Sequence, residues 1–99
     1  MANLSLNKIV ISGNKTINLT KNTELTVRFY KSIQSVSVVN LSNNVIFFRI
    51  DGELATIDNY NCIKLDANFR GFDLYSSTFF NEMSFISSSD SQFQLLNIR

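Results

Sequence analysis

The stretch NNVIFFRIDGEL, residues 43–54, raises the question on which the fold depends. A strand with one face in a core and the other in water alternates apolar and polar residues. One row of this stretch is apolar throughout: Ile46, Phe48 and Ile50. The opposite row starts with two apolar residues before it becomes polar: Val45, Phe47 and Arg49. We therefore expect protein to cover both faces of this strand.

The composition is that of one globular domain over residues 1–99, with 44% hydrophobic and 17% charged residues. A chain of this length buries roughly two thirds of its unfolded surface, which is enough for one core without disulfides. No segment has the ~18 apolar residues of a membrane helix, and the first residues do not resemble a signal peptide. Residues 1–7 are a possible N-terminal arm, and the lone Cys62 is interpreted as a small core residue.

Apolar residues recur with a period of two along most of the chain, as at residues 25–29, 62–66 and 72–77. A helix over Thr23–Val36 is the one rival, but β-branched residues favour a strand there, with a short helical turn possible at Lys31–Gln34. Turn signals recur every 8–12 residues. The expected fold is therefore all-β, an antiparallel β-sandwich of jelly-roll or Ig-like type with about eight short strands.

The clearest turn signal is Asp51-Gly52, since both central positions of a type I′ turn need positive φ. It predicts a hairpin in which the strand that contains Phe47 pairs with residues 53–57.

The net charge of +1 gives no electrostatic reason to expect nucleic-acid binding. The distribution is uneven: residues 1–50 carry six basic residues against Glu24, a balance of +5, and residues 51–99 carry seven acids against three basic residues, a balance of −4. Either strands of the two halves interleave and mix these charges, or a basic patch meets an acidic patch on a neighbouring subunit.

The residue types argue against enzyme chemistry and against a cofactor. The chain has no His, which is the usual general base and the most common metal ligand, and only three glycines. Asp51 and Glu53 flank a turn, where acids are ordinary. The one local candidate for a cation site groups oxygen-bearing side chains in and after one loop: Asp58, Asn59, Asn61 and Asp66. A plain polar loop is the alternative interpretation.

Surplus apolar surface is the remaining unusual feature. Phe79 and Phe80 are adjacent, so only one can point inward on an extended segment. Leu96 and Ile98 oppose the inward row of the last strand. Twist or covering loops could hide these side chains within one chain, and the alternative is burial against other protein. The expected interface residues are Phe47, Arg49, Tyr60, Phe79 and Phe80.

The order of strands and turns from VVNLS (residues 38–42) onward resembles small β-sandwich structural proteins of tailed bacteriophages, which decorate or join capsids. The matching segments are FRIDGELAT at residues 48–56, FDLYSS at residues 72–77 and MSFISSSDSQFQL at residues 83–95. The segment DANFRG departs from the Gly/Pro-rich loop of that pattern, and acids are fewer than it has. The likeness spans about two thirds of the chain.

The resemblance implies a non-enzymatic virion protein, synthesised in the host cytoplasm and forming a homo-oligomer, with capsid, portal or tail proteins as partners. It carries over no catalytic residue and implies no nucleic-acid or membrane partner. Two other classes stay open. A carbohydrate-binding module would stack sugars on Tyr30, Tyr60 and Tyr75, and a small inhibitor would bind one protein target.

Overall fold

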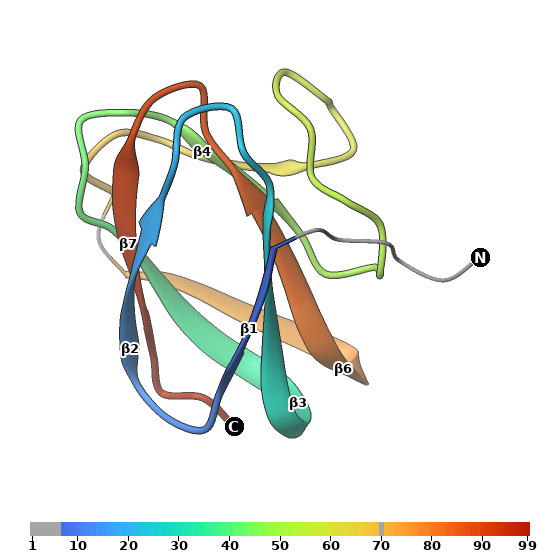
Figure 1. Ribbon diagram of the computed structural model, residues 1–99. Coiled ribbons are helices and arrows are strands. Elements are labelled where there is room, and N and C mark those ends of the chain that lie inside the picture. The colour runs from blue at the N-terminus through green and yellow to red at the C-terminus, as the bar shows by residue number, and fades with distance from the viewer. Residues whose placement is uncertain (1–6, 70) are drawn as a thin grey trace.

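The computed structural model describes residues 7–69 and 71–99, and within them every regular element is a strand (Figure 1). Seven strands are present in the described residues: β1 Lys8–Ile11, β2 Lys15–Leu19, β3 Leu25–Asn40, β4 Ile46–Arg49, β5 Ile63–Leu65, β6 Phe72–Ile86 and β7 Ser91–Leu96. They form one sheet in the order β2-β7-β3-β6-β4-β5, and β1 pairs with β3. All pairings are antiparallel except that of β1 with β3.

The two long strands, β3 and β6, pair with each other along two separate stretches and turn a corner between them (Figure 1). From Arg28 to Ile33 β3 advances five residues while β6 moves only from Glu82 to Phe80. From Ile33 to Ser35 the imbalance reverses, because β6 then advances five residues against two of β3. Each strand thus carries one bulge at the corner, and bulges of this kind bend strands sharply.

The bulges explain two differences from the sequence prediction. In β3 the inward row shifts from odd to even positions, from Phe29 and Ile33 to Val36 and Val38, which imitates helical spacing in a strand. Residues 31–34 belong to that strand and not to a helical turn. The alternating stretch at residues 72–77, expected as one short strand, is the first part of the 15-residue strand β6. The all-β, antiparallel character is confirmed, but the strands form one curled sheet, and a sandwich of about eight strands is not confirmed.

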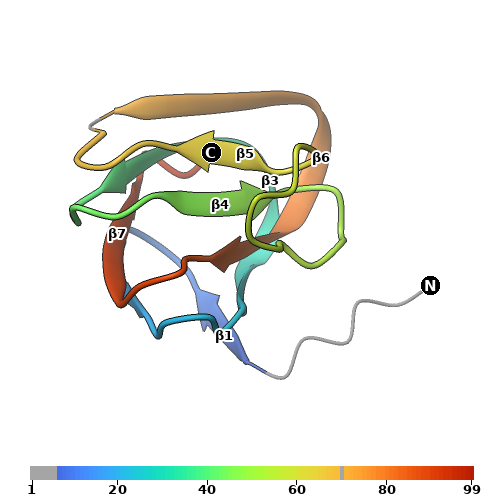
Figure 2. The same ribbon diagram turned by 90° about the horizontal axis from the view of Figure 1, so that it is seen from above.

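The main core lies on the inner side of the curled sheet (Figure 2). The ring of Phe85, from β6, stacks on Phe93 at a centroid distance of 4.1 Å and on Phe48 at 5.5 Å. Phe93 comes from β7 and Phe48 from β4, strands that are not neighbours in the sheet. The curl therefore brings side chains of distant strands into one aromatic stack, an arrangement that contributes beyond simple burial.

A one-residue bulge after β7 corrects another expectation. Ser37 pairs with Leu96, whereas Ser35 exchanges backbone hydrogen bonds with Arg99, so one extra residue stands in the C-terminal segment. Asn97 takes up this residue with a φ of 52°, a conformation that Asn tolerates better than most residues. As a result the side chain of Ile98 packs against the main core, whereas the sequence predicted that it faces away from the core.

The second face of β4 is covered by the chain itself. Phe47 is only 8% exposed and forms a second cluster with Ala55 and Ile86, which Ile57 and Cys62 border. The cover is the connection from β4 to β5, residues 50–62, drawn in yellow-green in Figure 1. The expectation that another chain must bury Phe47 is therefore wrong, and the intramolecular alternative holds.

The same connection replaces the predicted hairpin. Residues 53–57 form no strand, and β4 pairs instead with β5 and β6. Gly52 does adopt a positive φ of 85°, but Asp51 does not, so the turn is not of type I′. The backbone N–H of Ala55 donates to Ser84 Oγ at 2.7 Å, and Ser84 Oγ donates to Glu24 Oε2 at 2.5 Å. These bonds hold the connection flat against β6.

Charges of the two halves of the sequence meet in the fold. Lys8 Nζ lies 3.2 Å from Glu82 Oε2, and Arg28 Nη1 lies 3.6 Å from the same oxygen. At this point the strands interleave the basic and acidic halves. The predicted arm at residues 1–7 lies outside the described residues except for Asn7. No helix in residues 7–69 or 71–99 is long and apolar enough to cross a membrane.

Replacing Phe47 by Ala should lower the free energy of unfolding by about 3 kcal/mol, because it empties the centre of the second cluster. Urea unfolding followed by circular dichroism would measure the change. The matched control is Phe79→Ala, which removes the same ring from an exposed position and should change stability by less than about 0.5 kcal/mol. Equal effects of the two substitutions would show that the cluster does not stabilise the fold.

Candidate functional site

The structure places four of the five predicted interface residues in two recesses, and the fifth, Arg49, lines neither of them. Phe79 and Phe80 line a recess of about 490 Å³ between the corner of β6 and residues 50–52, and Asp51, the ion-pair partner of Arg49, lines it too. Phe47 and Tyr60 line a second recess of about 250 Å³ over the β4–β5 connection. We name these the corner recess and the loop recess.

The corner recess exists because β6 bulges there. Phe80 pairs with Ile33 and turns inward, where its ring meets Phe29 edge to face at a centroid distance of 6.3 Å. Phe79 consequently points outward and is 68% exposed. The prediction that only one of the two rings can face inward is confirmed. On the opposite strand Tyr30 is also exposed, so the outer side of the corner carries aromatic rings from both strands.

Arg49 and Asp51 form an ion pair beside the corner recess. Arg49 Nε donates to Asp51 Oδ1 at 3.0 Å, and Nη2 donates to Oδ2. The hydrogen bond from Arg49 lowers the pKa of the Asp51 carboxyl below its ordinary value, while partial burial opposes this shift. The same bond raises the pKa of the Arg49 guanidinium. Asp51 is thus held as a carboxylate, which makes it an unsuitable general acid to pair with Glu53.

The loop recess presents one ring to solvent. Tyr60 is 94% exposed at the tip of the β4–β5 connection, whereas Phe47 forms the buried floor. Asp58 also lines this recess, but Asp66 lies beyond β5 beside Lys64 at 3.9 Å. Asn59 Oδ1 accepts a hydrogen bond from the backbone N–H of Asn61 at 2.9 Å, within the loop. Among the described residues no three His, Cys, Asp or Glu side chains gather as metal ligands.

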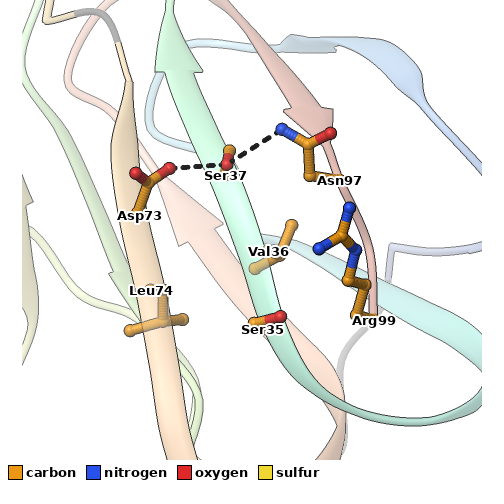
Figure 3. A pocket seen from close by; sticks show the side chains of 7 residues that line it. All are labelled: Ser35, Val36, Ser37, Asp73, Leu74, Asn97 and Arg99. Atoms are coloured by element: carbon orange, nitrogen blue, oxygen red, sulfur yellow. Dashed lines mark hydrogen bonds between the residues drawn. The ribbon is translucent and has the colours of Figure 1, made fainter.

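A third depression, not predicted from the sequence, crosses the outer face where β6, β3 and the segment after β7 lie side by side (Figure 3). It has a volume of about 310 Å³, and we name it the polar groove. Its lining residues come from these three segments: Ser35, Val36, Ser37, Asp73, Leu74, Asn97 and Arg99.

Hydrogen bonds join the three segments across this groove. Ser37 Oγ donates to Asp73 Oδ1 at 2.6 Å, and Asn97 Nδ2 donates to Ser37 Oγ at 3.4 Å (Figure 3). From the sequence alone, the alternation at residues 35–38 and 72–75 would have allowed the prediction that the two serines and Asp73 share one outer face. The contribution of Asn97 and Arg99 was not predictable, because it depends on the bulge at Asn97.

Searches with protein-family models, among curated proteins and among solved structures found no match to this chain.

The stability of the protein should depend on acid pH through the Arg49–Asp51 pair. The folded state lowers the pKa of Asp51, so the pair stabilises the fold above the ordinary value of 3.8 and loses this effect as the pH falls through the lowered pKa. Arg49→Met should therefore lower the thermal midpoint at pH 6 and shift it little near pH 2. An equal shift at both pH values, measured by circular dichroism melts, would contradict the electrostatic origin.

Proposed function

We propose that this chain is a non-enzymatic structural protein of a phage virion that binds capsid or head–tail components as an auxiliary subunit. The strand and turn pattern described above is the basis for the virion assignment. The coarse fold, a small all-β domain, is compatible with it. The protein's own contribution to binding would be the exposed side chains at the corner and loop recesses.

One observation carries the binding role: Phe79 holds a fully apolar ring 68% exposed beside a recess. Aromatic side chains are enriched in protein interfaces and concentrate at their energetic centres. Phe79 stands in the bulged stretch of β6, and this stretch is anchored by pairing with β3 on both of its sides. A ring that is already positioned loses less conformational entropy on binding.

The surroundings of Phe79 have the composition of an interface. Polar residues border the ring, among them Ser76, Thr78 and Glu82, and the Arg49–Asp51 pair lies at the rim of the same recess. An apolar centre with a polar rim is the usual arrangement of a protein interface. Tyr60, on the separate β4–β5 connection, offers a second contact.

Virions purified by density-gradient centrifugation from the source of this sequence should contain the chain. Trypsin would release the peptide of residues 71–99, which lies between two arginines of the sequence, and mass spectrometry would detect it. Enrichment of this peptide with the major capsid protein supports the proposal. Its absence from purified virions, while it is present in the infected-cell lysate, would overturn the virion assignment.

The corner recess can be tested with a matched pair of variants. Phe79→Ser should reduce incorporation into virions at least tenfold, because it removes the exposed ring without touching either core. Val10→Ser is the control, since Val10 is equally exposed on β1 away from that recess. Quantitative mass spectrometry of virions made with each variant gives the ratio. Equal incorporation of both variants would exclude the corner recess as the binding surface.

A further inference from the structure

The polar groove carries chemistry that the proposed structural role does not use. We propose that it is a binding site for an uncharged oligosaccharide, with Tyr75 as the stacking platform at its border. This inference is independent of the virion assignment, because it rests on another face of the molecule and on different residues.

The register of β3 and β6 places the required groups together. Ser35 pairs with Tyr75 and Ser37 pairs with Asp73. Alternate residues of a strand share one face, so Tyr75 stands on the same outer face as Asp73, next to the two serines. Val36 and Leu74, the residues between them, turn toward the core. The sheet thus offers a tyrosine ring beside a row of polar side chains.

The aromatic component of the site is exposed and has a fixed position. Tyr75 is 72% exposed, and its backbone lies within the β3–β6 ladder immediately before the corner bulge. The C–H face of a pyranose ring is apolar, whereas its rim carries hydroxyl groups. An exposed tyrosine can cover the apolar face of the sugar while neighbouring polar groups bind the hydroxyl groups at its rim.

The polar component supplies both donors and acceptors. Asp73 Oδ1 already accepts from Ser37, and among residues 7–69 and 71–99 no partner occupies Asp73 Oδ2. The guanidinium of Arg99 makes no ion pair within those residues. Asn97 adds an amide oxygen as an acceptor. Adjacent sugar hydroxyls each donate and accept, so a carboxylate, an amide and a guanidinium around one groove match them.

The same set of groups argues against a charged ligand. An anion would meet the Asp73 carboxylate, and a cation would meet the Arg99 guanidinium, because both side chains line the one groove. A neutral ligand with many hydroxyl groups avoids both repulsions. The groove volume of about 310 Å³ lies at the lower end of small-molecule sites, which suits one or two sugar rings of a longer chain.

The probes for a test are an array of immobilised neutral oligosaccharides and, in solution, cellotetraose, chitotetraose and maltotetraose. We expect at least one neutral glycan to bind the wild-type protein. Tyr75→Ala should weaken that binding at least tenfold, and Asp73→Ala should weaken it severalfold. Tyr60→Ala, which removes an exposed tyrosine from the loop recess, is the matched control and should bind as the wild type does.

A second measurement locates the site without any variant. Titration of the wild-type protein with the bound glycan should shift the amide resonances of residues 35–37, 73–75 and 97–99 in NMR spectra, and not those of residues 58–62. This result is valid even where Tyr75→Ala is unstable. Absence of binding to every neutral glycan, or shifts confined to residues 58–62, would overturn the proposal.

Discussion

Two neighbouring strands have to turn the same corner without losing their pairing, and the rest of the structure depends on this constraint. The solution is one bulge in β3 and one in β6, displaced along the pair. Because the strands bend together, the sheet curls and Phe48, Phe85 and Phe93 can meet in its interior. The residues left on the outside of the bend include Phe79. Stability and the proposed contact surface thus share one geometric origin.

The loop over Phe47 shows how a small domain can cover both faces of a strand. Ser84, 2% exposed, accepts the N–H of Ala55 and donates to Glu24, so its hydroxyl satisfies the loop backbone and is itself satisfied. A buried N–H without such a partner would cost about 1–3 kcal/mol. The apolar surplus of β4 therefore belongs to folding, and the apolar surplus of the corner remains available for binding.

The sequence predicted the strand rows wherever the backbone alternates regularly, as at residues 25–29, where Val27 and Phe29 are buried. The prediction failed where extra residues at a bulge change which side of the sheet the following side chains face. The β3 bulge imitated a helix, and the Asn97 bulge reversed the expected side of Ile98. The local turn chemistry of Asp51-Gly52 suggested a hairpin. The apolar side chain of Phe47 has to be buried, however, and the longer connection of residues 50–62 packs over it instead. The polar groove was missed because its residues come from three segments. The alternation of apolar and polar residues does not reveal the register in which these segments pair.

The position of β7 has a consequence for how the chain is made. The last strand along the sequence lies between β2 and β3 in the sheet. During synthesis the edges of these two strands stay unpaired until residues 91–96 have left the ribosome. Exposed edges recruit other strands, so a nascent chain is open to mispairing at these edges until β7 joins the sheet. Docking of β7 between β2 and β3 closes both edges at once and ends this exposure.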